Sequence, residues 1–178
     1  TITVESNPAP DDWGRFGHGA AFAGAEALIW GGWADEGGTP AAPQFLAYSP
    51  AEDSWRERSP APFPTTGDAE VAWTGTELLV VGGQITEGGD VSDSAGAYDP
   101  ATDTWRVLDP LPVPRGNDAS VRMDAVWDGE HLTVWWPDAG VVAQLSPSTG
   151  AWTAVSTPTL ELGVGGTADL LLLGDTVV

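Results

Sequence analysis

The chain has 178 residues, 26 of them acidic and 6 basic, with a net charge of −20, no cysteine, 23 glycines and 15 prolines. The negative charge argues against binding to nucleic acid or to anionic membrane surfaces, because their phosphates would be repelled, and the lack of cysteine excludes disulfides and thiolate chemistry. So many glycines and prolines predict short elements joined by tight turns and argue against a helical bundle.

The first predicted element is a strand at residues 1–5, followed by the proline-containing segment Asn7-Pro-Ala-Pro10. The chain begins at Thr1 without an initiator methionine, so we expect that it was processed or cut out of a longer polypeptide. No apolar run approaches the length of a membrane span, since the longest, Leu170 to Leu173, has the length of a strand.

Residues 17–59 form the first of three similar units and contain four predicted strands. Two apolar segments flank Gly24-Ala-Glu, which is typical of a β-hairpin. The second segment, Leu28–Trp30, is continuously apolar, as expected for a strand that is covered on both faces. The elements that follow are a polar loop at 34–43, a strand at 45–48, a turn at 49–53 and a last strand from Trp55.

The same pattern of landmarks returns at residues 68–109 and 119–156. The first landmark is Gly31-Gly32, which returns after 51 residues as Gly82-Gly83 and, altered, as Trp136-Pro137. The second is a tryptophan seven residues after a tyrosine or leucine: Tyr48 and Trp55, Tyr98 and Trp105, Leu145 and Trp152. The third is a proline-rich joint, at 60–64, at 110–114 and, more weakly, at Thr157-Pro158. Such regular recurrence indicates a repeat of about fifty residues.

Four short strands cannot bury both faces of their sheet alone, but sheets stacked radially around an axis can. The glycine doublets allow close approach of the backbone at the end of the second strand. The spaced Tyr and Trp side chains meet on adjacent strands and pack between sheets. Asp53 and Asp103 precede the tryptophans, where we expect hydrogen bonds from side chain to backbone that shape a turn, and Gly150 stands near that place in the third repeat.

These landmarks resemble the kelch repeat, whose pattern is a glycine doublet followed by a spaced tyrosine and tryptophan around a proline-containing turn. The segment Arg15-Phe-Gly-His18-Gly also looks like the approach to a first strand in that family. The resemblance covers nearly the whole chain and implies an all-β, kelch-type β-propeller of four-stranded antiparallel blades. The expected blades are residues 17–59, 68–109 and 119–156, with 1–10 ending a preceding blade and 168–178 starting a further one.

Three blades and two fragments do not close a ring, because propellers have four to eight blades and the resemblance implies six or seven. An open run would leave unpaired strand edges. We therefore expect the chain to be one partial propeller over residues 1–178. The missing blades would come from the rest of the polypeptide, from a second chain or from a copy of this one, and we favour the first source.

Residues suited to catalysis are scarce in this sequence. His18 and His131 occupy different positions in the repeat, so they are not expected to share a metal ion. The acidic loop at 87–93 offers oxygen ligands for calcium, but its spacing matches no EF-hand loop, and a solvated loop is the preferred interpretation. No nucleophile, phosphate-binding or zinc-protease motif is present, and we predict no catalytic residue, metal or cofactor.

The predicted function is that of a non-enzymatic scaffold that binds a protein or glycan partner through loops at one face, because variable loops on a rigid scaffold carry recognition. Trp33 follows the first doublet outside the repeat pattern, and an exposed tryptophan is a frequent anchor, although packing within the loop is the preferred interpretation of this residue. The candidate binding residues are Trp33, Asp35, Glu36, Glu87, Asp90, Asp93 and His18.

The alternative is the propeller portion of a carbohydrate-active oxidase or isomerase. Galactose-oxidase-like members of the family use copper with a tyrosine crosslinked to cysteine, whereas this chain has no cysteine and its two tyrosines both belong to the repeat. The residues of such a site would therefore lie mostly outside this chain. The acidic composition, rich in Thr, Ser, Gly and Trp, favours an extracellular or cell-envelope location.

Overall fold

The structure, a computed structural model, describes residues 14–64, 67–85, 90–112, 123–136, 141–155, 172–173 and 176–177. Every regular element in these residues is a β-strand, and they contain no helix. The predicted all-β fold is therefore confirmed. The strand predicted at residues 1–5, the joint at 7–10 and the joint at Thr157-Pro158 lie outside the described residues.

Three sheets of four strands each are paired antiparallel in chain order. The first sheet contains β1 (Gly19–Phe22), β2 (Ala27–Trp30), β3 (Phe45–Ser49) and β4 (Ser54–Glu57). The second contains β5 (Glu70–Trp73), β6 (Leu78–Val81), β7 (Ala95–Asp99) and β8 (Thr104–Val107). The third contains β9 (Asp124–Trp127), β10 (Leu132–Trp136), β11 (Val141–Ser146) and β12 (Ala151–Val155). A two-stranded sheet of β13 (Leu172–Leu173) and β14 (Thr176–Val177) follows.

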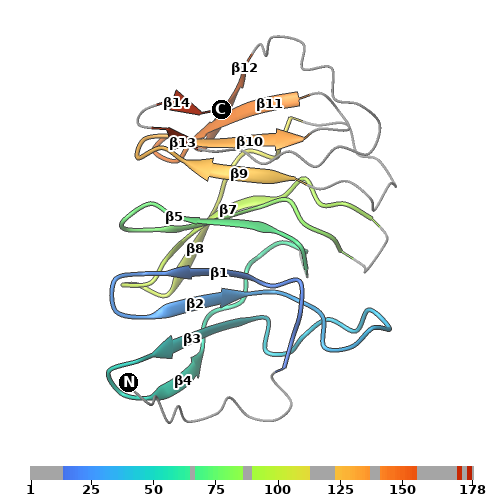
Figure 1. Cartoon of the computed structure of the whole chain (residues 1–178), viewed down its shortest axis with the longest axis vertical. Coiled ribbons are helices and arrows are strands. Elements are labelled where there is room, and N and C mark those ends of the chain that lie inside the picture. The colour runs from blue at the N-terminus through green and yellow to red at the C-terminus, as the bar shows by residue number, and fades with distance from the viewer. Residues whose placement is uncertain are drawn as a thin grey trace.

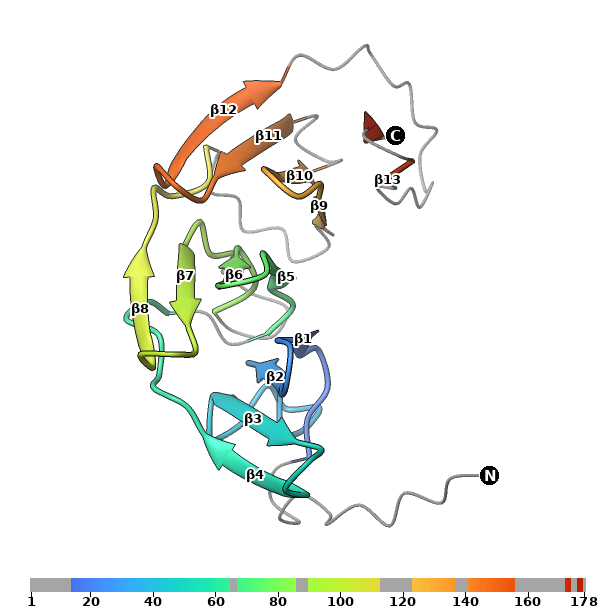
Figure 2. The ribbon, with the colours of Figure 1, turned by 90° about the vertical axis from the view of Figure 1, so that its left-hand side faces the viewer.

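The three sheets lie one after another along the long axis of the molecule (Figure 1). Their first strands, β1, β5 and β9, lie next to one another on the inner side, and β4, β8 and β12 lie on the outer side (Figure 2). The sheets therefore fan around a common axis, as the blades of a propeller do.

The central sheet is buried on both faces, and strand β6 shows how. Leu78 and Val80 belong to the apolar core shared with the first sheet, whereas Leu79 and Val81 belong to the core shared with the third. Successive side chains of a strand point to opposite faces, so a continuously apolar strand supplies both cores at once. All four side chains are at most 1% exposed.

The glycine doublets are required by backbone conformation as well as by space. Gly31 and Gly32 have φ angles of 64° and 101°, and Gly82 and Gly83 have angles of 65° and 90°. These values lie in the left-handed region, which favours glycine. A Cβ atom at Gly32 would lie only 2.8 Å from the backbone carbonyl oxygen of Phe16, so close approach of the backbone also excludes a side chain there.

The repeated tryptophans pack where the sequence predicts. Trp105 pairs in register with Tyr98, and Trp152 pairs with Leu145. The indole Nε1–H of Trp105 donates to the carbonyl of Ser59 at 2.8 Å, and that of Trp152 donates to the carbonyl of Asp109 at 2.8 Å. Because Ser59 and Asp109 follow β4 and β8, each of these tryptophans fastens its sheet to the outer strand of the sheet before it.

The aspartates before the tryptophans act differently from the prediction. Asp53 and Asp103 have φ angles of 47° and 55°, which supports a turn role. Their carboxylates, however, accept hydrogen bonds from the hydroxyl groups of Tyr48 and Tyr98. The backbone partner of Asp103 lies in the preceding sheet, where the amide of Ser59 donates at 3.1 Å and its hydroxyl at 3.0 Å. This aspartate therefore joins two sheets as well as shaping its own turn.

Candidate binding pocket at the loop face

The long loops of the first two sheets leave the molecule at one end. Strands alternate in direction, so the β2–β3 loop at 31–44 and the β6–β7 loop, 82–94, emerge on the same side, to the right in Figure 1. The tight turns lie at the opposite end. We call the two ends the loop face and the turn face. The described candidates all belong to loop-face segments: His18, Trp33, Asp35, Glu36, Asp90 and Asp93.

The acidic candidates supply charge to the loop face. Asp35, Glu36 and Asp90 are exposed, and Asp93 is half-buried. The Asp35 carboxylate accepts hydrogen bonds from Thr39, and one from the amide of Gly37 at 2.9 Å, and these bonds lower the pKa of Asp35. His18 is exposed just before β1, and Glu87 lies outside the described residues. The structure brings these side chains to one end without gathering them into one site.

Trp33 is packed rather than presented to solvent, because its indole is only 1% exposed. The Trp33 backbone pairs with Phe16 and Pro40, which holds the residue inside its loop. A Cβ atom at Gly67 would lie 2.3 Å from Trp33 Nε1, so the indole fills the space between the first sheet and the start of the second. Packing, the preferred interpretation of this residue from the sequence, therefore describes it better than a role as an exposed anchor.

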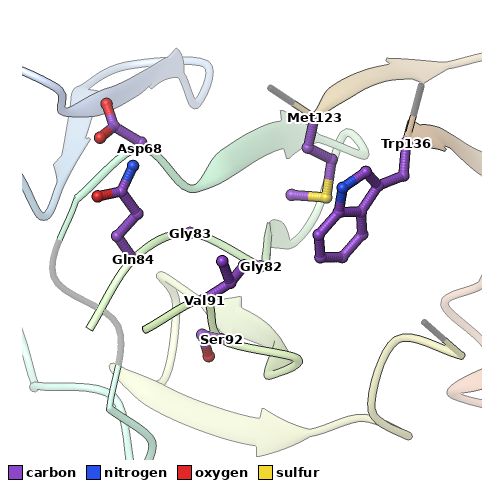
Figure 3. Close-up of a pocket in the computed structure, with 8 residues that line it drawn as sticks. All are labelled: Asp68, Gly82, Gly83, Gln84, Val91, Ser92, Met123 and Trp136. Atoms are coloured by element: carbon purple, nitrogen blue, oxygen red, sulfur yellow. The ribbon is translucent and has the colours of Figure 1, made fainter. Parts of the chain in front are cut away.

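The corresponding place between the second and third sheets is not filled in this way. Gln84 pairs with Gly67 and Val91 as Trp33 pairs with Phe16 and Pro40, so the two residues hold equivalent positions. Beside Gln84 lies a small pocket (Figure 3). The residues that line the pocket are Asp68, Gly82, Gly83, Gln84, Val91, Ser92, Met123 and Trp136.

The pocket has an apolar side and a polar side. Met123, just before β9, and Trp136, at the end of β10, lie together on the side of the third sheet (Figure 3). Asp68 and Gln84 lie together on the opposite side of the view, where the Asp68 carboxylate points away from Met123 and Trp136 (Figure 3). Oδ1 of Asp68 lies against the first sheet, since a Cβ atom at Gly17 would be only 2.8 Å from it. Ser92 is 3% exposed, and its hydroxyl oxygen accepts a hydrogen bond from the amide of Ser94 at 3.1 Å. The pocket is thus lined by an indole and a thioether on one side and by an amide side chain on the other.

Further carboxylates surround the polar side. Glu70 begins β5 and Asp124 begins β9 on the inner side of the sheets. Burial, together with the negative charges of Asp124 and Asp68, raises the pKa of Glu70 to about 7. The described residues contain no group of three or more histidine or acidic side chains arranged to hold a metal ion. The nearby carboxylates therefore make the electrostatic potential at the pocket negative.

The sequence marked Gly82, Gly83 and Trp136 as landmarks of the repeat but did not predict that they line one pocket. Asp68, Met123 and Trp136 belong to two different repeats, so their proximity depends on how sheets pack. One signal was present, because Gln84 follows the second doublet where Trp33 follows the first. A smaller side chain at the same place in a repeat indicates space at the next junction.

Comparison with known families and proteins adds one positive finding. Residues 66–112, which include all of the second sheet, match the family model of the Kelch motif. No curated protein matches the chain. Among the described residues, no helix has the length and apolar character needed to cross a membrane.

Proposed function

We propose that the chain, in which residues 66–112 match the Kelch motif, is a non-enzymatic binding scaffold that engages a partner protein through its loop face. The scaffold is rigid, since the central sheet is packed on both sides. Loops held by such a framework present their side chains in a defined arrangement, which lowers the entropic cost of binding.

The observation that carries this proposal is that a pocket and the acidic side chains of the long loops lie at the same end of the molecule. Exposed Asp35, Glu36 and Asp90 extend the negative surface beyond the pocket. With a net charge of −20, the chain repels anionic ligands and attracts basic surfaces. A basic protein therefore fits this face better than a neutral or acidic glycan, the other partner class that we considered.

The enzyme alternative has no comparable support. The only two tyrosines, Tyr48 and Tyr98, both donate their hydroxyl hydrogens to aspartates within the repeat. Burial, together with the hydrogen bond to Asp103, raises the pKa of Tyr98. Both phenols thus serve packing, and the binding proposal uses neither of them.

The proposal includes the rest of the ring. The sheets fan around one axis, and further blades supplied by the same polypeptide would cover the two outermost sheet faces. Such blades would hold the loop face rigid, and they leave the pocket between the second and third sheets unchanged.

A peptide-display experiment tests the proposed function. The full chain is used to select from a random peptide library, in parallel with a glycan array. We expect recovery of peptides rich in arginine and lysine. The double variant Asp35→Asn/Glu36→Gln should recover markedly fewer of them. The matched control Glu52→Gln/Glu130→Gln removes the same charge from exposed positions at the turn face and should select as the original chain does. Equal recovery by all three proteins would refute a role of the loop face.

A further inference from the structure

We propose that the first sheet carries a docking site for the chain's own segment 1–10, in which Asn7 binds to Asp53 and Trp55. We call Tyr48, Asp53 and Trp55 the first-sheet site. Residues 1–10 lie outside the described residues, whereas the equivalent contacts at the two junctions between the described sheets are defined. The site lies at the β3–β4 turn, away from the loop face, so this inference does not depend on the proposed function.

The first-sheet site has the same geometry as the site by which the second sheet holds the first. Tyr48 pairs in register with Trp55, and their ring centroids are 4.9 Å apart, against 5.1 Å for the corresponding pair of the second sheet. The hydroxyl of Tyr48 donates to Oδ1 of Asp53 at 2.7 Å, as the tyrosine of the second sheet does to Oδ1 of Asp103. Asp53 and Asp103 also share a left-handed backbone, with φ angles of 47° and 55°. The first sheet therefore presents the same groups in the same arrangement.

The site of the second sheet binds one residue of the preceding blade, Ser59. The indole Nε1–H of Trp105 donates to the carbonyl of Ser59 at 2.8 Å. The amide of Ser59 donates to Oδ1 of Asp103 at 3.1 Å, and its hydroxyl donates to Oδ2 at 3.0 Å. Pro60 follows directly, and a proline restricts the residue before it to an extended backbone. Three hydrogen bonds thus hold one extended residue that leaves the preceding blade.

The residue that is bound at each described junction matches the acceptor that it meets. Ser59, whose side chain can donate, meets the carboxylate of Asp103. Asp109, whose ionised side chain has no donor, meets Gly150, and there the backbone carbonyl accepts from the Asp109 amide at 3.0 Å. An aspartate against a carboxylate would place two like charges side by side. The first sheet has the carboxylate of Asp53, so its site requires a residue with a side-chain donor.

Asn7 meets this requirement and has the right neighbours in the sequence. It begins Asn7-Pro-Ala-Pro10, as Ser59 begins Ser59-Pro-Ala-Pro62 and Asp109 begins Asp109-Pro-Leu-Pro112. Asn7 stands 12 residues before the first residue of β1, against 11 residues from Ser59 to β5 and 15 from Asp109 to β9. The side-chain amide of asparagine can donate to Oδ2 of Asp53 as the hydroxyl of Ser59 does to that of Asp103.

The residues on either side of Asn7 support the same placement. The third residue of each segment packs at a junction: Ala61 lies against the core between the first and second sheets, and Leu111 belongs to the core between the second and third. Ala9 holds that place in segment 1–10. The strand predicted at 1–5 ends two residues before Asn7, as β4 and β8 end two residues before Ser59 and Asp109. Asn7 would therefore fasten the blade that precedes the first sheet.

Hydrogen exchange in the full chain tests the docking. The sequence contains two asparagines, Asn7 and Asn117, so labelling with ¹⁵N-asparagine gives two backbone amide signals, which Asn117→Gln assigns. We expect the Asn7 amide to exchange at least about tenfold more slowly in the full chain than in a peptide of residues 1–10, because it donates to a carboxylate. The indole Nε1–H of Trp55 should likewise exchange more slowly than a free indole.

Two substitutions of Asn7 separate docking through Asp53 from general burial. Asn7→Ser copies Ser59 and should keep the protection of the Trp55 indole. Asn7→Asp places a second carboxylate beside Asp53 and should speed exchange of that indole about tenfold. Thr3→Asp adds the same charge at a position equivalent to the exposed Arg56 and should leave exchange unchanged. Unchanged protection of the Trp105 indole in each variant shows that the junction between the first and second sheets is intact.

Three results would overturn the proposal. The first is an Asn7 amide that exchanges in the full chain as fast as in the peptide. The second is an equal effect of Asn7→Ser and Asn7→Asp on the Trp55 indole. The third is protection of the Trp55 indole that rises with protein concentration, because a second copy of the chain would then occupy the first-sheet site.

Discussion

The first two blades and the third build the same sheet with different side chains. The first two each contain a glycine doublet, a tyrosine bonded to an aspartate and a glutamate bonded to an arginine. The third blade has lost all three. At the equivalent positions it carries Trp136-Pro137 for the doublet, Leu145 and Gly150 for the tyrosine and aspartate, and His131 and Thr153 for the glutamate and arginine.

Comparing the first two blades with the third shows which interactions between neighbouring blades are kept. The indole bond to the preceding blade is kept, by Trp105 to Ser59 and by Trp152 to Asp109. The second link is also kept, although its chemistry changes. In the third blade the backbone carbonyl of Gly150 accepts from the amide of Asp109 at 3.0 Å, a bond that the carboxylate of Asp103 makes with Ser59 in the second. Tyrosine and aspartate are replaced together, because either one alone would leave a polar group without its partner.

The divergence of the third blade also produces the pocket. Trp136 stands where the first two blades have the first glycine of a doublet, so an indole reaches the second junction from the third blade. Gln84 is smaller than Trp33, which holds the equivalent position of the first blade, and so leaves room for this indole. The pocket at this junction is therefore lined by residues of two blades that differ in their packing.

The largest effect on stability is expected for Trp105, which packs among aromatic side chains. Its ring packs against Trp30, Phe45, Phe63 and Tyr98. Trp105→Ala should lower the free energy of unfolding by about 3–5 kcal/mol, as measured by denaturant titration.

Trp152→Ala, at the equivalent position of the third blade, serves as the comparison for Trp105→Ala. Trp152 also lies beside the preceding blade, but its bond to Asp109 is exposed. We expect a cost of about 1–2 kcal/mol, since less apolar area is lost and the bond is open to water. Equal costs at both positions would mean that the blades are fastened alike.

The second prediction concerns variants that give the second blade the residue types found at the equivalent positions of the third blade. Asp103→Gly should cost about 2 kcal/mol, because Tyr98 and the amide of Ser59 both lose an acceptor. The double variant Tyr98→Leu/Asp103→Gly should be less destabilised than the sum of the single variants by about 1 kcal/mol, as a double-mutant cycle measures. Strict additivity would show that the two positions are independent.

The third prediction concerns pH and compares the inner strands. Gly19 begins β1, whereas Glu70 begins β5 with a pKa raised to about 7 by burial and by the charges of Asp124 and Asp68. A carboxyl whose pKa is raised on folding supports stability below its unfolded pKa of about 4.5, and this support is lost as the pH rises through 7.

Glu70→Gln removes that dependence. The variant should be more stable than the original chain by about 1–2 kcal/mol at pH 8, with the difference vanishing near pH 4. Denaturant titrations across this range check the sign. A variant that is less stable than the original at pH 8 would show that the ionised Glu70 has a favourable partner.

The smallest effects are expected at the ion pairs that the third blade lacks. Glu26 bonds Arg56 and Arg58, and Arg58 is only 10% exposed, so Glu26→Gln should cost about 1 kcal/mol. Glu77 pairs with the exposed Arg106 alone, and Glu77→Gln should cost about 0.5 kcal/mol or less. Thermal unfolding in low and high salt separates the two, because only the exposed pair is strongly screened.

What the sequence could predict follows from which features repeat. The spacing of Tyr98 and Trp105 placed both on adjacent strands, because a seven-residue spacing across a turn sets the register of a hairpin. The contact of Trp33 with Gly67 was not predicted, because Gly67 belongs to the next blade. The hydrogen bond that the amide of Ser59 donates to Asp103 was not predicted for the same reason. The spacing of residues predicts which strands pair within a sheet, whereas contacts between blades depend on how the sheets are stacked.

The central claim is that the repeated tryptophans fasten each blade to the one before it, and hydrogen exchange of the indole Nε1–H groups tests it most directly. The signals of Trp105 and Trp152 can be assigned with Trp→Phe variants at each position. We predict that both exchange more slowly than a free indole, with Trp105 the slower of the two, because each donates to a carbonyl of the preceding blade. Exchange of Trp105 at the rate of a free indole would contradict this architecture.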